Sequence, residues 1–162
     1  HARNAWLEGL SPSENRNIPP LKHSWVYQLK RDFPTLTIVL NGGVTTLDDC
    51  HEALQHVDGV MLGRAIYKNP WLLTTIDFEI LNGLPTDQSR HEVITQMAAY
   101  ISKHLSNGGQ FSHIARHLLG LFREQPGGKI FRRQLSQIMH DSDADADSLL
   151  DILPRLSVAN LA

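Results

Sequence analysis

Two short apolar segments, each running into a glycine turn, constrain the fold of this chain more than any other feature. Residues 37–43 read Thr-Ile-Val-Leu-Asn-Gly-Gly, and residues 59–64 read Gly-Val-Met-Leu-Gly-Arg. Between them, residues 46–55 have the pattern of a helix that Thr46 caps, with Asp49 near its third position. The order strand, helix, strand predicts a βαβ unit with two parallel strands.

The two glycine turns are candidates for binding a phosphate group. The last two strands of a TIM barrel build such a site from backbone N–H groups and a short helix N-terminus. Glycine lets the backbone approach phosphate oxygens, and an arginine fork can pair with them through two hydrogen bonds. The candidate residues predict a phosphorylated cofactor, and they are Asn41, Gly42, Gly43, Gly63 and Arg64. In the alternative interpretation, the glycines only make a tight turn and the arginine is a surface charge.

Composition excludes several classes of protein. The sequence has 162 residues, of which 41% are apolar and 20% charged, as in an average globular protein. This length suits one domain or part of a larger one. Its apolar runs are far shorter than the roughly 20 residues of a membrane helix, and its N-terminus does not resemble a signal peptide, so we expect a cytoplasmic protein. One cysteine allows no internal disulfide, and we expect no metal site. The net charge of −2 means that any nucleic-acid surface must be local.

The organisation of the chain suggests that it begins in the middle of a fold. A closed barrel needs eight strands and about 250 residues, and only two convincing strands are visible. We therefore expect residues 1–80 to be the C-terminal part of a TIM (β/α)8 barrel and residues 86–162 to be a small all-α domain. Helices are expected at 23–33, 46–55, 65–73 with a break at Pro70, 89–106 (with a stripe at Val93, Met97, Tyr100, Ile101 and Leu105), 112–123, 129–140 and 148–156.

Basic side chains are concentrated in one part of the expected all-α domain. Seven of them lie within 21 positions that contain Glu124 as the only acid. Lys129 and Arg132 are three residues apart, hence on one helical face, and they are spaced to contact neighbouring phosphates of one backbone. The alternative is an ordinary solvated helix face. This basic ridge consists of His113, Arg116, His117, Arg123, Lys129, Arg132 and Arg133.

An ordered set of motifs resembles the C-terminal half of the tRNA-dihydrouridine synthases. The segments at residues 10–16 and 18–21 resemble the dihydrouridine synthase A branch in particular. The resemblance covers nearly the whole chain. Its motifs are His1-Ala2-Arg3, Asn41-Gly42-Gly43, Gly63-Arg64-Ala65, Asn69-Pro70 and Arg116-His117-Leu118-Leu119-Gly120-Leu121-Phe122.

The resemblance implies a flavin enzyme that reduces the C5–C6 double bond of D-loop uridines in tRNA, around positions 20 and 20a. Reduced FMN delivers hydride to C6, a cysteine acid protonates C5, and NADPH reduces the flavin again. The fold would be a TIM barrel followed by a helical tRNA-binding domain. The implied cofactor is FMN, the implied partners are NADPH and tRNA, and the complete protein would be a monomer.

The resemblance also assigns roles to individual residues. His1 would touch the flavin near the end of the sixth barrel strand. Asn41, Gly42 and Gly43 would follow strand seven, Gly63 and Arg64 would follow strand eight, and together these residues match the FMN-phosphate segments.

The tRNA contacts of the family fall at Ser13, Arg16, Lys129 and Arg132. Ser13 stands where lysine is common and Lys129 where arginine is common. Lysine keeps the charge but loses the planar fork, while serine keeps only a hydrogen bond. Arg16 has a structural alternative, which is an ion pair with Glu14 or Asp32.

Cys50 lies in the helix that follows the first strand, among acidic neighbours that disfavour a thiolate, so we interpret it as a packing residue. The catalytic cysteine of the family would lie upstream of His1. We therefore expect no catalytic residue in this chain, and we expect the chain alone to be inactive. It should also expose a sheet edge and the inner faces of its helices.

Three functions from different classes remain open on the sequence. The first is the flavin-dependent tRNA reductase, the second an FMN-dependent barrel dehydrogenase of a small molecule, and the third a non-catalytic RNA-binding module. A small-molecule enzyme would not need the basic ridge, and a binding module would not need both glycine turns. The three tryptophans, Trp6, Trp25 and Trp71, are expected as core or interface anchors, with base stacking as the alternative.

Overall fold

The computed structural model describes residues 1–153, which fall into two compact units. The first comprises His1–Ala65, and the second begins at Ile66. The expected domain division between residues 80 and 86 stays a prediction. In the part of the chain that is described, no helix is both long and apolar enough to cross a lipid bilayer.

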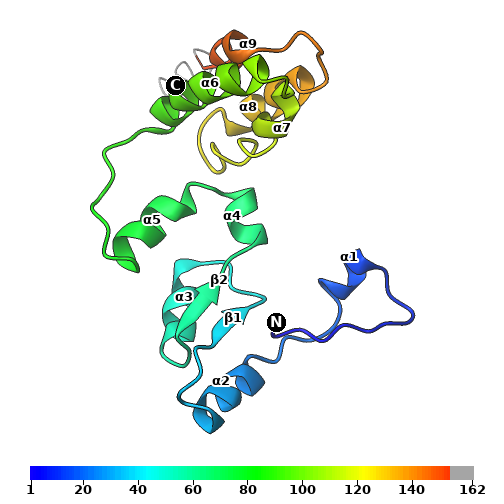
Figure 1. Cartoon of the computed structure of the whole chain (residues 1–162), viewed down its shortest axis with the longest axis vertical. Coiled ribbons are helices and arrows are strands. Elements are labelled where there is room, and N and C mark those ends of the chain that lie inside the picture. Colours follow the sequence, from blue (N-terminus) through cyan, green and yellow to red (C-terminus); the bar gives the residue numbers. More distant parts are fainter. Residues whose placement is uncertain (154–162) are drawn as a thin grey trace. The chain divides into compact units, whose positions relative to one another are not determined.

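The first unit contains the predicted βαβ arrangement. Its two strands pair in parallel, with Val39 opposite Gly59 and Asn41 opposite Met61, and α3 connects them (Figure 1). This confirms two parallel strands, while closure into a barrel stays a prediction. The elements are α1 (Pro12–Asn15), α2 (His23–Asp32), β1 (Val39–Asn41), α3 (Leu47–Leu54) and β2 (Gly59–Met61).

The start of α3 is determined by its own sequence. Thr46 accepts a hydrogen bond from the backbone N–H of Asp49, and the Asp49 carboxylate accepts one from the N–H of Thr46, as the pattern predicts. Cys50 and Ala53 then lie on the buried face of the helix. The small core of this unit consists of Ala2, Pro19, Ile38, Leu40, Val44, Cys50, Ala53 and Val57.

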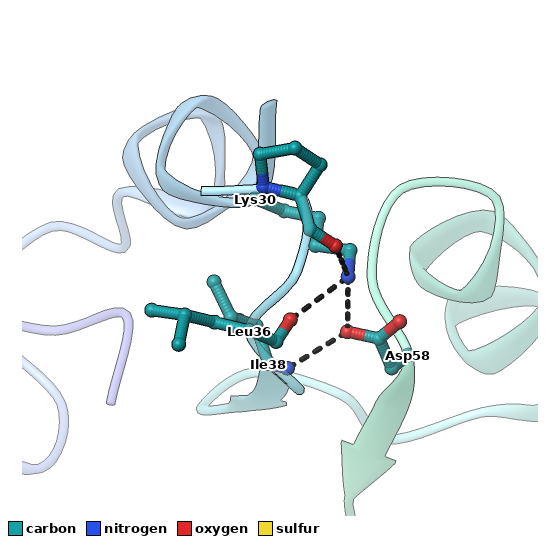
Figure 2. Close-up of polar contacts among 5 residues, drawn as sticks. Lys30, Leu36, Ile38 and Asp58 are labelled. Carbon is teal, nitrogen blue, oxygen red and sulfur yellow. Dashed lines mark hydrogen bonds and ion pairs between the residues drawn. The ribbon is translucent and has the colours of Figure 1, made fainter. Parts of the chain in front are cut away.

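A polar cluster joins α2 to the edge of the sheet where both strands begin (Figure 2). The Lys30 ammonium donates to the Asp58 carboxylate at 2.8 Å and to the carbonyls of Pro34 and Leu36 at 2.9 and 2.8 Å. The same carboxylate accepts from the backbone N–H of Ile38 at 2.8 Å. β1 begins at Val39, directly after this hydrogen bond and two residues later than the apolar run from residue 37 predicts.

The first unit exposes much of its apolar surface. Trp25, Leu29 and Phe33 follow one face of α2 at intervals of four residues and are 66%, 46% and 52% exposed. Val39 on β1 and Met61 on β2 are also half exposed. Exposed apolar surface of this kind is expected where an α/β layer is only part of a larger sheet.

The elements described after β2 are all helices. The second unit has one apolar core, built from residues of α6, α7, α8, α9 and the turns between them: Ile94, Ala98, Ile101, Phe111, Ala115, Leu118, Leu121, Phe122, Phe131, Leu135, Ala144, Leu149 and Ile152. That these helices form a separate all-α domain stays a prediction. The elements are α4 (Arg64–Lys68), α5 (Leu72–Glu79), α6 (Arg90–Ser106), α7 (Phe111–Ala115), α8 (Gly128–Ile138) and α9 (Ala146–Leu150).

The expected helix at 112–123 is wrong over most of its length. α7 ends at Ala115, and the chain continues in tight turns, with bonds such as Leu121 N–H to Leu118 O at 3.0 Å and Arg123 N–H to Gly120 O at 3.1 Å. The turns allow Gly120 to pack against the backbone carbonyl of Lys68, which a side chain at that position would prevent. Tertiary packing therefore overrides the helical pattern.

Three smaller differences have local causes. The predicted interruption at Pro70 is present, but a further helix, α5, follows it. The sequence does not indicate this helix, because its β-branched residues have low helix propensity and Trp71 provides no side-chain cap. In α6, Ile101 of the predicted stripe is buried and Val93, Met97 and Leu105 pack against the core, but Tyr100 is 55% exposed, and Ile94 and Ala98 are buried in addition. α9 begins at Ala146, capped by Asp145, and the end of the helix expected at 148–156 lies outside the described residues.

Candidate functional site

The N-terminal segment lies beside β1 and brings His1 to the end of that strand. The Ala2 N–H donates to the Asn41 carbonyl at 2.7 Å, and the Lys22 N–H donates to the Ala2 carbonyl at 2.7 Å. A Cβ atom added at Gly42 would lie 2.8 Å from Cε1 of His1, so the imidazole packs directly on this glycine. The structure thus brings together His1, Asn41 and Gly42, which are about 40 residues apart in sequence.

The turn after β1 requires both of its glycines. Gly42 and Gly43 have φ angles of 111° and 82°, in the region that L side chains rarely adopt. The carbonyl of Gly42 lies 2.7 Å from Nε2 of His23, and a side chain at Gly43 would overlap Leu21. The turn is therefore fixed in one conformation by its neighbours.

The turn after β2 differs from the turn after β1, because close packing does not require a glycine at position 63. A Cβ atom at Gly63 would make only an ordinary contact, 3.7 Å from the side chain of Met61. Within residues 1–153, no hydrogen bond uses the backbone N–H of Gly43 or Gly63. Since β1 and β2 are parallel neighbours, both turns follow the same edge of the sheet. Open N–H groups on two glycine turns fit an anionic group such as a cofactor phosphate.

Arg64 extends from the first turn of α4 to the loop that carries the predicted tRNA residues. Its Nη1 donates to Oδ1 of Asn17 at 2.9 Å and its Nη2 donates to the carbonyl of Arg16 at 3.1 Å. The guanidinium thus fastens this loop to the glycine turn. A direct contact of Arg64 with phosphate stays a prediction.

The predicted tRNA residues Ser13 and Arg16 lie on and just after α1, three residues apart and both exposed. Ser11 and Glu14 form a capping box at the start of this helix. The structural alternative for Arg16 is not found, because no ion pair in the described part of the chain joins it to Glu14 or Asp32. Glu14 instead accepts from Ser11 at 2.6 Å.

A basic pocket of about 750 Å³ lies within the second unit. It brings together Lys129 and Arg132 of α8, Arg116 and Arg123 of the turn region, and Lys68 at the end of α4. Against these five basic side chains stands one acid, Glu124. The full lining is Tyr67, Lys68, Arg116, Leu119, Gly120, Phe122, Arg123, Glu124, Gln125, Gly128, Lys129 and Arg132.

Two close backbone approaches shape this pocket. A Cβ atom at Gly120 would overlap the carbonyl of Lys68, and one at Gly128 would overlap the carbonyl of Phe122. Between them, Glu124 has a φ of 61° in the left-handed region, where the chain reverses before α8. Main-chain atoms of Lys68 and Phe122 therefore lie directly against the glycines of the pocket wall.

Most of the cationic groups of the pocket remain free to bind anions. Lys68, Lys129 and Arg132 make no ion pair or side-chain hydrogen bond within the described residues. Arg116 uses only Nε, which donates to the Ser112 carbonyl at 2.8 Å. The Arg123–Glu124 pair at 3.1 Å is exposed and therefore weak.

The basic ridge contributes only part of this pocket. His113, His117 and Arg133 are outside its lining, while Tyr67 and Lys68, which the charge pattern does not indicate, are inside it. The only sequence signal for these two is their position directly after the second glycine turn. Trp71 packs against the helical core with the Arg90 guanidinium 4.2 Å from its ring centre, as expected of an anchor, whereas Trp6 and Trp25 are exposed.

Cys50 is completely buried, as expected of a packing residue. Burial, with a further contribution from Asp49, raises the pKa of its thiol. A raised pKa keeps the thiol protonated and unreactive at neutral pH. Residues 1–153 contain no cluster of three or more histidine, cysteine or acidic side chains arranged to hold a metal ion.

Comparison with known proteins identifies the family. The family model described as dihydrouridine synthase (Dus) matches residues 1–157, nearly the entire chain. The chain belongs to the dihydrouridine synthase family. This confirms the resemblance seen in the glycine-turn motifs and in the segment from Arg116 to Phe122.

Individual relatives agree with this assignment. The chain is 51% identical over 146 residues to a tRNA-dihydrouridine(20/20a) synthase of Salmonella typhi, with 90% of this chain and 44% of that protein covered. It is 50% identical over 144 residues to the protein of the same name from Shewanella oneidensis, covering 89% and 43%. For that of Vibrio vulnificus the identity is 44% over 156 residues, covering 96% and 48%. The chain thus spans somewhat less than half the length of these curated relatives.

Proposed function

We propose that this dihydrouridine synthase chain supplies the FMN-phosphate site and a tRNA-binding surface of a tRNA-dihydrouridine(20/20a) synthase. One observation carries the proposal. The chain has two glycine turns with open N–H groups at the ends of its parallel strands, and it also has a basic pocket among its helices. The first suits a phosphorylated cofactor, and the second suits a nucleic-acid backbone. A dehydrogenase of a small molecule would have no use for the second feature.

The cofactor proposal rests on the turns after β1 and β2. The N–H groups of Gly43 and Gly63 would donate to the phosphate of FMN, and His1 would lie against the flavin from its place on Gly42. Arg64 would add positive charge while it holds the loop at Asn17. Bound FMN would supply the hydride that reduces the uracil C5–C6 bond, and NADPH would restore the reduced flavin.

The tRNA proposal rests on the cations of the basic pocket. Lys129 and Arg132 lie on one face of α8, make no ion pair with any residue from 1 to 153, and would contact successive phosphates of the tRNA backbone. Ser13 and Arg16 form a second exposed pair in the first unit and would add a hydrogen bond and a charge. Lys129 gives a point charge where arginine would give a fork, so its contact should depend mainly on charge.

A chimera tests this function directly. The segment of the Shewanella oneidensis protein that matches this chain is replaced by residues 1–162, and the product is incubated with FMN, NADPH and unmodified tRNA transcript. We expect dihydrouridine to form, detected by mass spectrometry of digested nucleosides. The matched control is the same chimera with Lys129→Ala and Arg132→Ala, which should retain FMN but lose most of its tRNA affinity. A folded chimera that does not retain FMN, or whose tRNA affinity the two alanine substitutions leave unchanged, would contradict the proposal.

A further inference from the structure

Tyr67 is an exposed aromatic residue on the wall of the basic pocket. Its side chain is 57% exposed although it belongs to α4, whose end packs against the turn at Gly120. Its ring meets His117 edge to face, with centres 5.3 Å apart and planes at 77°. Its hydroxyl takes part in no hydrogen bond within the described residues. The ring is thus positioned by a neighbour without being buried.

Packing alone does not account for this placement. An aromatic ring that stabilises a core is largely buried, and a tyrosine that is buried usually satisfies its hydroxyl with a hydrogen bond. Tyr67 has neither feature. It shares the pocket with five cations, whereas Tyr100 of α6, which is 55% exposed, lies outside the pocket. Tyr100 therefore provides a matched comparison on the same chain.

We infer that Tyr67 is a stacking platform for one unpaired base of an RNA strand whose phosphates bind Lys129 and Arg132. The inference rests on the proposed function and adds a base contact to its backbone contacts. Single-stranded nucleic acid is bound in general by a basic groove that follows the backbone together with aromatic rings under the bases. Both components are present here within one cavity of about 750 Å³.

The size and charge of the pocket restrict the ligand. Ligand pockets of roughly 300 to 1,000 Å³ accept a small organic group, so a cavity of about 750 Å³ has room for one nucleotide. Five basic side chains exceed what the single phosphate of a mononucleotide needs. A strand with several phosphates, of which one base is splayed out, uses the whole arrangement. His117 acts as a positioning residue, because it touches the ring of Tyr67 and is not itself part of the lining.

The test uses the 162-residue chain, with the chimera described above as a second preparation that carries the same pocket. The probe is an eight-nucleotide single-stranded RNA with 2-aminopurine at its centre, whose fluorescence is quenched when the base stacks. Uridine monophosphate is titrated in parallel. The variants are Tyr67→Ala, Tyr67→Phe and, as the matched control, Tyr100→Ala. Each is checked by circular dichroism and thermal unfolding.

Tyr67→Ala is expected to weaken RNA binding roughly 5-fold to 100-fold and to abolish quenching, which is the range that stacking of one base contributes. Tyr67→Phe and Tyr100→Ala should bind and quench as the unchanged chain does. In one outcome, RNA binding depends on salt and weakens in Lys129→Ala but stays unchanged in Tyr67→Ala. That result would overturn the stacking inference and leave the proposed function intact. Equal affinity for uridine monophosphate and the oligonucleotide would overturn the assignment to a strand. Absence of RNA binding by both unchanged preparations would overturn both proposals.

Discussion

Nζ of Lys30 lies 2.8 Å from Oδ2 of Asp58, which places the ion pair at the edge of the sheet where β1 and β2 begin. The glycine turns that are candidates for phosphate binding follow the opposite edge. In α/β folds of this kind, the edge where strands begin serves stability and the edge where they end carries function. The two edges can therefore be perturbed separately.

The first prediction concerns pH and Asp58. The hydrogen bond from the Ile38 N–H, followed by that from Lys30, lowers the pKa of the Asp58 carboxyl. A carboxyl with a lowered folded-state pKa contributes stability above its unfolded pKa of about 3.9 and loses it as pH falls through the folded pKa. Asp58→Asn should thus lower the free energy of unfolding at pH 6. The difference in unfolding free energy between the variant and the unchanged chain should shrink as the pH falls below about 4. Urea unfolding between pH 3 and 7 measures this, with Asp32→Asn as the control. A difference in unfolding free energy that is the same at every pH would contradict this prediction.

A second prediction separates binding from stability at Gly63. Its added Cβ meets only Met61 at 3.7 Å, so Gly63→Ala should change the unfolding free energy by no more than about 0.5 kcal/mol. It should nevertheless weaken FMN binding by the chimera, because the methyl group projects where phosphate would approach. Gly42→Ala is the contrasting variant, since its φ of 111° and the contact with His1 cost about 1 kcal/mol or more. Flavin fluorescence and thermal unfolding measure the two effects. Unchanged FMN affinity in Gly63→Ala would remove this glycine from the phosphate site.

The third prediction concerns the wall of the basic pocket. Gly120→Ala places a methyl group against the Lys68 carbonyl, which cannot yield without a backbone shift, so we expect a loss of about 1 to 3 kcal/mol in unfolding free energy and weaker RNA binding. Gly108→Ala is the control, because its φ is 79° but no atom lies within 4 Å of the added Cβ. It should show the backbone strain alone and bind RNA normally. A Gly120→Ala variant as stable as the unchanged chain would show that the approach of Gly120 to Lys68 is wrong.

Cys50 provides a fourth prediction. Because burial and Asp49 raise the pKa of its thiol, iodoacetamide should modify the native chain slowly at pH 7 to 8 and react quickly after unfolding in urea. Cys50→Ser, which buries a hydroxyl, should destabilise the chain by about 1 to 3 kcal/mol, and Cys50→Ala by less. Cys50→Ala should leave dihydrouridine formation by the chimera unchanged. Loss of activity in a stable Cys50→Ala chimera would give this residue a role beyond packing.

A fifth prediction uses salt to count phosphate contacts. Removing one contact with Lys129→Ala should reduce the slope of log affinity against log salt concentration by about 0.7 for single-stranded RNA. Lys129→Arg should keep the slope, since the charge remains. Lys103→Ala, an exposed lysine of α6 outside the pocket, is the control and should leave the slope unchanged. Filter binding at several salt concentrations gives the slopes. Equal slopes for Lys129→Ala and the unchanged chain would exclude Lys129 from the phosphate contacts.

The features that the sequence predicts well depend on neighbours in the chain. The strand, helix, strand order and the Thr46–Asp49 capping box are local patterns, and the structure contains both. The glycine turns after the strands were likewise visible, because a left-handed turn restricts the choice of residue.

The features that the sequence did not predict depend on contacts between distant segments. The helix expected at 112–123 is lost where Gly120 meets Lys68, which is 52 residues earlier. The place of Tyr67 in the pocket follows from that same contact. The approach of His1 to Gly42 is visible in the sequence only through family resemblance, because no local pattern joins two positions 41 residues apart. Periodicity describes a helix and its faces, and it contains no information on which distant backbone those faces meet.

Gly120 and Gly128 bring the carbonyls of Lys68 and Phe122 against the pocket wall, and these two main-chain contacts do not involve the charged side chains that line the cavity. A substitution at Lys129 or Arg132 therefore changes the charge that a ligand meets and leaves these two contacts in place. A protein that keeps both glycines can therefore alter which RNA it prefers through single substitutions of the charged lining residues, while the backbone that supports them stays the same.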